Sequence, residues 1–504
     1  MPQRPLRDLA LNQGAFLLSF VGKAIVFVVI SRHLGKESLG HYAYAMTFAV
    51  TFFLVSNLGL SSTQVREISK HPHRLFDFLS SLAVLQFLIV LALLPPFLIY
   101  AVFLVPDPTL SIFLGLALVL AALEKLRHFL GSNLNGLGLI STLSLTSVLE
   151  IGLELGLILG AFFLTRDLVA VFLAYIVKGC LAIAYVSWLN ATAADQLLSK
   201  AGALPRSLLW PSLHLDLRRL LCELGTRLLA RQEAPPISGM WLDFLRQVGP
   251  VFQWELLQAL LLFSPMLLLE HLSGPIAVAD YAVCTKTASF FNFLLFGIGV
   301  VYLPKFSQAP EAGAIAGHVR DLVRYVGLLA LPLGVGAWFV AEEVLIAIWG
   351  LRFAGLAPWF LLSLTTLLLT FLSQGLKTLA IARERLTPLI RLAAGILLCK
   401  VALLLWLVPR STASGAVLSD LGAEIFLTLG LFTAFVLEYR DFRPDLLALT
   451  RYLFGCAVMA AGLTLFPTAS LPLDIALGAT LYGLILLPWE GRTLLSQLRR
   501  NPAR

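Results

Sequence analysis

The chain has 504 residues, of which 59% are hydrophobic and 13% are charged, and its mean hydropathy is +0.87. Soluble domains usually carry about 25% charged residues, so this composition excludes a mainly soluble protein and predicts an all-α polytopic membrane protein. The net charge of +8 does not predict a nucleic-acid partner, because the basic residues are spread over short connections. The five cysteines form no CxxC pair, so neither a metal site nor a disulfide framework is predicted.

Apolar runs long enough to cross a bilayer, about 20 residues each, follow one another along the chain. They predict about fourteen transmembrane helices, arranged as two pseudo-symmetric six-helix lobes with two further C-terminal helices. The predicted domains are an N-lobe at 1–190, a cytoplasmic connection at 191–247, a C-lobe at 248–440, and two extra spans with a tail at 441–504. The predicted spans are residues 11–31, 40–61, 76–104, 109–129, 140–164, 168–189, 248–270, 276–303, 325–349, 358–381, 390–408, 414–437, 451–467 and 472–489.

The basic residues predict the orientation of these spans. With the N-terminus in the cytoplasm, five of the 37 Lys and Arg residues lie in external connections, five lie in mid-span, and all the others are cytoplasmic, Lys125 and Arg127 among them. Basic residues accumulate in cytoplasmic connections, so we expect a multi-pass protein of the plasma (inner) membrane with both termini in the cytoplasm. The five external residues are Arg32, Lys36, Arg166, Arg352 and Arg410.

The longest connection separates the two lobes. Its middle, Leu213–Leu229, mixes leucines with Arg218, Arg219 and Arg227. This pattern is typical of an amphipathic helix that lies on the anionic inner leaflet. A partly ordered linker is an equally open interpretation.

Five lysines lie in the middle of apolar runs. A charge at the bilayer centre costs roughly 2.5–3.5 kcal/mol on insertion scales, so such residues are expected to face water or an anionic ligand. Two of them accompany polar stripes at helical spacing: Asn12 and Ser19 precede Lys23, and Thr366, Thr370 and Ser373 precede Lys377. Such stripes line a hydrated cavity or hold neighbouring helices together. The five lysines are Lys23, Lys178, Lys286, Lys377 and Lys400.

Three carboxylates inside spans are candidates for ion coupling: Glu150, Glu154 and Glu255. Glu150 and Glu154 are four residues apart and therefore share a helix face. They form a protonation site, or one of them neutralises Lys178 on the next span; both interpretations stay open. By the same reasoning we expect Lys400 to pair with Glu424.

A pattern near the N-terminus is typical of one family. Its landmarks are Arg32, Leu34, Gly35, Gly40, Tyr42, Leu58, Gly59, Leu60, Arg66, Glu67 and Ile68. Residues 281–308 echo this pattern, and Gly415-Ala416 resembles another landmark of the family. The chain thereby resembles the oligosaccharide flippases, which handle O-antigen and other polysaccharides, of the multidrug/oligosaccharidyl-lipid/polysaccharide exporter superfamily. It departs from the pattern at Asn57, where an acidic residue is common, and at Ala279, where glycine is common.

The resemblance implies two six-span lobes around a central cavity and transport by alternating access. The implied cargo is a polyprenyl-diphosphate-linked oligosaccharide, with membrane lipid as the second partner and other polysaccharide-assembly membrane proteins as an open alternative. We expect Lys23, Lys286 and Lys377 to contact the diphosphate, and we add Arg32 and Arg66 of the family pattern to the candidate substrate-binding residues. No cofactor is implied.

Three alternative functions compete with this one. A peptidoglycan-precursor lipid flippase is a close relative. A cation-coupled multidrug exporter of the same superfamily would need a carboxylate in its N-lobe cavity, whereas the first span has Lys23 and no internal acid. A membrane enzyme acting on lipid-linked glycans would need large external loops, and the predicted ones are short. Gly35-Lys36 lacks the upstream glycine of a phosphate-binding loop, so ATP hydrolysis is not predicted.

Overall fold

The computed structural model describes residues 4–57, 61, 64–65, 68, 75–200, 237–292, 298, 302–303, 305–308, 311–383, 385–440, 442–466 and 470–500. Within these ranges the regular structure is entirely helical. Eleven of the described helices are long and apolar enough to cross a membrane. The prediction of an all-α polytopic membrane protein is confirmed, and each predicted span coincides, wholly or in part, with a described helix.

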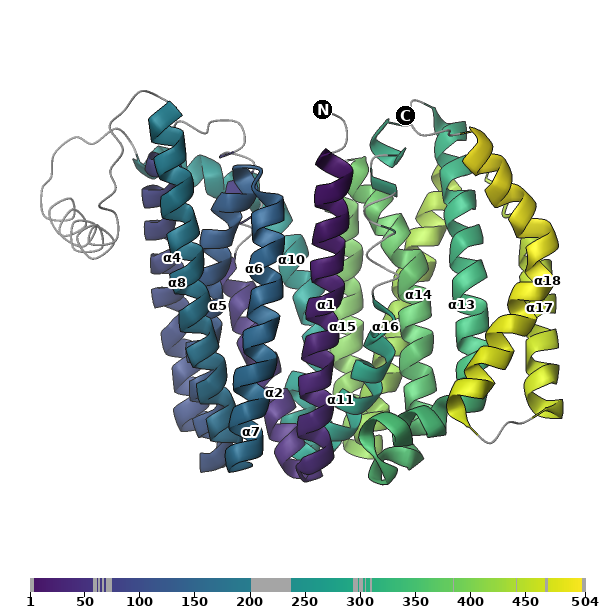
Figure 1. Ribbon diagram of the computed structural model, residues 1–504, viewed down its shortest axis with the longest axis horizontal. Coiled ribbons are helices and arrows are strands. Elements are labelled where there is room, and N and C mark those ends of the chain that lie inside the picture. Colours follow the sequence, from purple (N-terminus) through teal and green to yellow (C-terminus); the bar gives the residue numbers. More distant parts are fainter. Residues whose placement is uncertain are drawn as a thin grey trace, which may run out of the picture. The chain divides into compact units, whose positions relative to one another are not determined.

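The chain divides into two compact units, Met1–Phe263 and Ser264–Arg504. The helices of the first unit are drawn from purple to dark teal in Figure 1. They are α1 (Arg4–His33), α2 (Lys36–Asn57), α4 (Leu75–Ile99) with its π-helical continuation η2 (Tyr100–Leu104), α5 (Pro108–Gly136), α6 (Ile140–Leu153) with the π-helical η3 (Glu154–Leu159) and α7 (Gly160–Thr165), and α8 (Leu168–Lys200). Helix α10 (Ile237–Ser273) begins in this unit and ends in the next.

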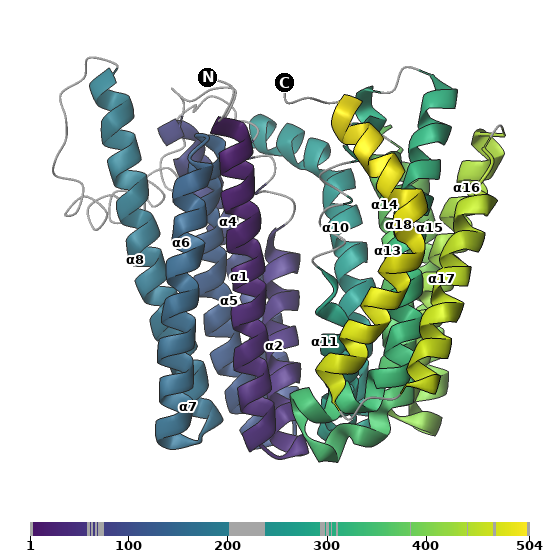
Figure 2. The same ribbon diagram turned by 45° about the vertical axis from the view of Figure 1, so that its right-hand side comes forward.

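The second unit holds the remaining helices. They are α11 (Pro275–Ser289), α13 (Ala312–Trp349), the short 3-10 helix η4 (Leu351–Leu356), α14 (Ala357–Ala382), α15 (Leu386–Ser411), α16 (Ala413–Glu438), α17 (Leu446–Leu465) and α18 (Leu471–Arg500). Figures 1 and 2 show α17 and α18 side by side next to α13, against which both of them pack. The two C-terminal helices are thus attached to the second unit through α13.

The two units repeat one packing scheme. In the first unit α5 packs against α2, α4 and α8, and in the second α14 packs against α11, α13 and α16. Likewise α6 packs against α5 and α8, and α15 packs against α14 and α16. Matching helices stand in the same order along the chain in both units, as two copies of a parallel structural repeat would.

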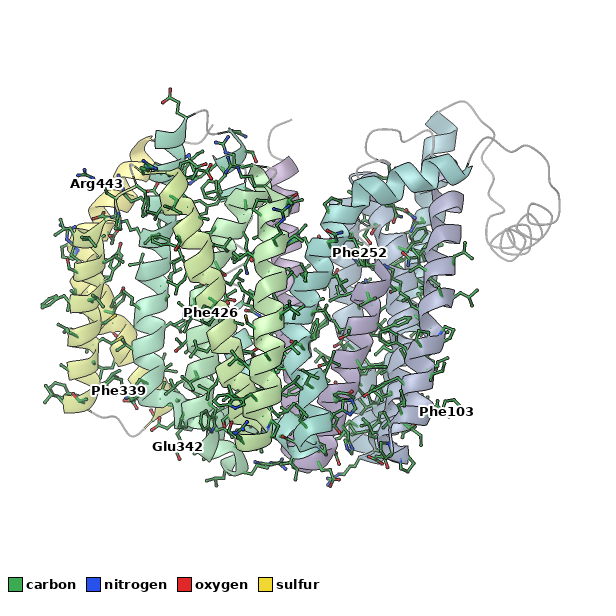
Figure 3. The ribbon with its side chains drawn as sticks, turned by 180° about the vertical axis from the view of Figure 1, so that it is seen from behind. Phe103, Phe252, Phe339, Glu342, Phe426 and Arg443 are labelled. Atoms are coloured by element: carbon green, nitrogen blue, oxygen red, sulfur yellow. The ribbon has the colours of Figure 1, made fainter. Side chains whose placement is uncertain are left out.

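Many helices expose apolar side chains, and some charged side chains lie at the ends of helices. Phe103 is 78% exposed in the first unit and Phe426 is 59% exposed in the second (Figure 3), which suits contact with lipid. In the second unit Arg443 and Glu342 lie at opposite ends of the helices in the same figure. The turns are tight where glycine permits positive φ: Gly274 (79°) follows α10 and Gly350 (96°) follows α13.

The fold revises one expectation and leaves another untested. Lys125 and Arg127, which the sequence assigns to a cytoplasmic connection, lie within α5, and this helix continues to Gly136; the side of the membrane that they face stays a prediction. The predicted amphipathic helix at 213–229 lies outside the described residues. The lobe boundaries predicted at 190 and 248 stay predictions.

Candidate functional site

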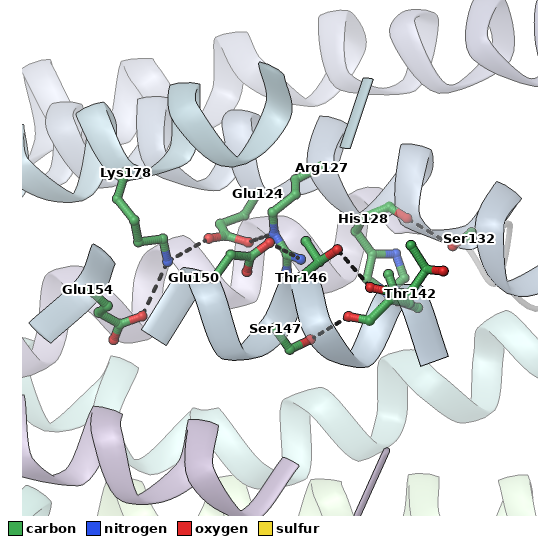
Figure 4. A network of polar contacts seen from close by, with 11 residues as sticks. Glu124, Arg127, His128, Ser132, Thr142, Thr146, Ser147, Glu150, Glu154 and Lys178 are labelled. Atoms are coloured by element: carbon green, nitrogen blue, oxygen red, sulfur yellow. Dashed lines mark hydrogen bonds and ion pairs between the residues drawn. The ribbon is translucent and has the colours of Figure 1, made fainter. Parts of the chain in front are cut away.

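A group of charged side chains lies between the helices of the first unit (Figure 4). Lys178 of α8 places its Nζ 3.3 Å from Oε1 of Glu124 on α5 and 3.3 Å from Oε2 of Glu154 on η3. The Lys178 side chain is 6% exposed and that of Glu154 is 4% exposed. Glu154 opens a π-helical segment, a local deformation of the kind that often occurs at functional positions. One of the two roles left open for Glu154, neutralising Lys178, is therefore present in the structure.

Arg127 extends this group toward α6. Its Nε lies 2.8 Å from Glu124 and its Nη1 lies 3.2 Å from Oε1 of Glu150 (Figure 4). Glu150 therefore has an arginine partner of its own, although the two glutamates share one helix face. Its role as a proton-coupling group stays a prediction.

Lys23 of α1 completes the charge balance of this group. It is exposed, and it interacts electrostatically with Glu124 and Glu150. The neighbouring Gly22 explains the proximity, because a Cβ at this position would lie 2.7 Å from Ile151 of α6. Only glycine allows α1 to approach α6 so closely. With Lys23 included, three cations face the three carboxylates of the group.

A second polar group of the first unit was missed by the sequence analysis. Lys125 of α5 is buried and donates from Nζ to Oδ1 of Asn57, 2.5 Å away. Ser61 donates to the same Oδ1 at 2.8 Å, and Glu255 of α10 interacts electrostatically with Lys125 and hydrogen-bonds the Asn57 side chain. Two features of the sequence pointed to this group: Asn57, which departs from the family pattern, and Lys125, which lies within an α-helix. Glu255 thus faces a cation of its own unit.

The second unit holds another buried ion pair, and its partners correct a prediction. Lys400 of α15 places its Nζ 2.6 Å from Oδ1 of Asp420 on α16. Tyr281 of α11 donates to Oδ2 of the same carboxylate at 2.5 Å. The expected partner, Glu424, was wrong: it lies one turn further along α16, where Ser373 of α14 donates to it at 2.5 Å. Spacing along α16 alone could not decide between two acids on one face.

The remaining candidate residues are placed as follows. Lys377 of α14 is buried and interacts electrostatically with Glu424, so an acid of a neighbouring helix faces it, although its own helix offers none. Lys286 of α11 is exposed, and so is Arg32 in the last turn of α1. Arg66 lies outside the described residues. Because Lys23 belongs to one unit and Lys286 and Lys377 to the other, their convergence on one site stays a prediction.

Comparison with known proteins identifies the family. A family model described as "Polysaccharide biosynthesis protein" matches residues 7–309. The chain belongs to this family. No curated protein sequence matches it.

Solved structures share its fold. A lipid II flippase, MurJ, in an inward closed conformation matches with a TM-score of 0.71 at 12% identity, covering 96% of this chain and all of the other. An inward-facing multidrug resistance MATE family transporter of the MOP superfamily matches with a TM-score of 0.63 at 14% identity over 84% and 95% of the two chains. A MOP superfamily transporter from Pyrococcus furiosus, whose binding pocket is described as of reverse polarity, matches with a TM-score of 0.53 at 14% identity over 87% and 96%. The resemblance stated from the sequence is thereby confirmed.

Among the described residues no group of His, Cys, Asp and Glu is arranged to hold a metal ion. The carboxylates that could attract a cation are instead matched with side-chain cations. Glu154 and Asp420 are the clearest cases, each bound by a lysine of a neighbouring helix. In the described part of both units, buried ion pairs therefore join neighbouring helices, and in the first unit the exposed Lys23 lies beside them.

Proposed function

We propose that this protein is a flippase that moves a polyprenyl-diphosphate-linked oligosaccharide from the cytoplasmic to the outer leaflet by alternating access. The family match over residues 7–309 carries the proposal, because it links the chain to polysaccharide biosynthesis. The fold shared with transporters supports it. The lipid-linked precursor of peptidoglycan is the nearest alternative cargo, since a lipid II flippase has the same fold.

The distribution of lysines supports an anionic cargo. Lys178 and Lys400 each lie within salt-bridge distance of carboxylates on neighbouring helices and hold these helices together. Lys23 and Lys286 are exposed on α1 and α11, which the sequence predicts to cross the membrane, where an ammonium group is costly without water or an anion. A diphosphate would supply that anion, and lysine suits it as a mobile point charge with three donors.

In this proposal Lys23, Lys286 and Lys377 contact the diphosphate, and Arg32 and Arg66 attract it or guide it at the ends of the spans. Lys23 is the strongest candidate, since it stands beside carboxylates that already have cationic partners. The cargo would then compete with those carboxylates for the lysine. Organic cations, by contrast, would meet an exposed lysine on α1.

The test is transport by purified protein in liposomes. The cargo is a labelled polyprenyl-diphosphate oligosaccharide, and the appearance of label in the opposite leaflet is measured by an impermeant glycan-modifying reagent. We expect transport by the parent chain and a loss of about tenfold or more in Lys23→Gln, because a hydrogen bond to a charged group contributes about 1.5–3 kcal/mol. Lys36→Gln, which removes a lysine at the start of α2, is the matched control and should retain transport. Export of an organic cation without movement of the lipid would refute the proposal.

A further inference from the structure

The polar cores of the two units use the same helix positions. Tyr42 is the seventh residue of α2 and Tyr281 is the seventh residue of α11. Tyr42 makes a hydrogen bond of 3.1 Å with Tyr175, the eighth residue of α8. Tyr281 donates to Asp420, the eighth residue of α16, at 2.5 Å. Each tyrosine thus reaches the matching position of the matching helix.

The same register places opposite charges on two matching helices, α6 with its continuation η3 in the first unit and α15 in the second. Glu154 is the fifteenth residue counted from the start of α6, and Lys400 is the fifteenth residue of α15. Glu154 pairs with Lys178 of α8 at 3.3 Å, whereas Lys400 pairs with Asp420 of α16 at 2.6 Å. The position that holds a carboxylate in the first unit, Glu154, therefore holds a lysine in the second, Lys400, and the charge of its partner is reversed as well.

A third helix contributes a polar side chain at the matching position in each unit. Glu124 is the seventeenth residue of α5 and contacts Lys178. Ser373 is the seventeenth residue of α14 and contacts Glu424 of α16. In the first unit α8 presents its cation to α5 and η3; in the second unit α16 presents its carboxylates to α14 and α15.

We propose that these opposite signs specify which helices pair while the protein assembles in the membrane. Because the two units follow one packing scheme, α8 and α16 occupy equivalent places in their units. If α8 took the place of α16, Lys178 would join Lys400 and Lys377, and both lysines would lose the carboxylates that α16 supplies, Asp420 and Glu424. If α16 took the place of α8, Asp420 and Glu424 would join Glu124, Glu150 and Glu154, so that five carboxylates would share the two cations Arg127 and Lys23. Buried charges without a counterion are strongly unfavourable, so each wrong pairing is rejected.

This role does not depend on the cargo, and it differs from simple stabilisation. If each ion pair only stabilises its own unit, then exchanging the two charges of a pair is tolerated or harmful regardless of the other unit. If the opposite signs specify pairing, exchanging the charges in one unit gives both units the same signs, so that α8 and α16 can take each other's place. Exchanging the charges in both units makes the signs opposite again and restores the correct pairing. The decisive observation is therefore recovery by a change in the distant unit.

The experiment uses the full chain in native membranes, with its own cysteines replaced. A cysteine pair at Leu123 and Gly179 reports the correct neighbours α5 and α8, because a Cβ at Gly179 lies 3.4 Å from Cβ of Leu123, near the separation that a disulfide needs. Disulfide formation under mild oxidation is measured in four backgrounds: the parent, E154K/K178E/E124Q, K400E/D420K, and all five changes together.

We expect the crosslink to fall at least twofold in each single-unit exchange and to recover to the parental extent when both units are exchanged. Full crosslinking in both single-unit exchanges would overturn the proposal. A loss that the combined variant does not recover would also overturn it, since it would show only that the exchanged pairs disturb their own unit.

Discussion

The ion pair between Lys178 and Glu154 offers the sharpest test of how charge is used inside the first unit. The perturbations are Lys178→Met, Glu154→Gln and the two together. Both side chains are almost fully buried, and their charged atoms lie 3.3 Å apart. The pair is therefore screened far less than a surface salt bridge, and removing one partner leaves the other as a buried charge.

The magnitude follows from this geometry. At an effective dielectric constant of about 20, two unit charges separated by 3.3 Å attract by about 5 kcal/mol. Desolvation offsets much of that attraction in the intact pair, but removal of one partner of a buried pair typically costs about 3–5 kcal/mol. Lys178→Met should be the more damaging change, because Glu154 then has no lysine partner, while in Glu154→Gln the lysine keeps Glu124. The double variant should be less destabilised than Lys178→Met.

Two readouts are needed. The first is the amount of monodisperse protein and its apparent melting temperature in detergent, and the second is transport of the labelled lipid in liposomes. We expect both readouts to fall together in the single variants and to recover together in the double variant. If Glu154→Gln folds like the parent but loses proton-dependent transport, and Lys178→Met does not rescue it, then the ion-pair reasoning is wrong and Glu154 is a coupling group.

Three further predictions concern packing and orientation. Gly415→Ala should destabilise the protein by about 1–3 kcal/mol in thermal unfolding, because the added Cβ would lie 2.8 Å from backbone atoms of α15. Gly422→Ala is the matched control, since its Cβ would meet one side-chain atom at 3.7 Å. Arg324→Met should lower the apparent melting temperature by loosening α18 from α13, because the guanidinium binds both carboxylate oxygens of Glu490. Glu490→Gln should lower it by a similar amount. If the decreases of the two single variants add up in the double variant, the two residues do not act through one contact. A cysteine at Ser238, near the start of α10, should react with an impermeant reagent only from the cytoplasmic side, and labelling from outside would reverse the predicted topology.

The sequence predicted the helices well because the membrane imposes a simple rule. A segment that crosses lipid must satisfy its own backbone and remain apolar over about 20 residues, and each predicted span coincides, wholly or in part, with a described helix. Lys125 and Arg127 resemble the charged cytoplasmic end of a span, yet they lie inside α5, which continues to Gly136. Glu124 of the same helix binds Arg127, but the other partners of these charges come from other helices, and hydropathy along one segment cannot show this.

The partners of the charged groups were decided by tertiary structure. The sequence identified Lys178 and Lys400 as buried cations and named Glu154 as a possible partner of the first, which the structure bears out. The sequence predicted Glu424 as the partner of Lys400, whereas Asp420 is the partner in the structure. Both acids lie on the same face of α16, and only the height at which α15 crosses that face selects between them. Likewise, Glu154 and Lys400 occupy matching positions with opposite charge, a relation that becomes visible only when the packing of the two units is compared. Apolar length and charge bias are properties of single segments, so the sequence determines the spans and the class of protein; ion pairing depends on the rotation and depth of neighbouring helices, which only the folded structure sets.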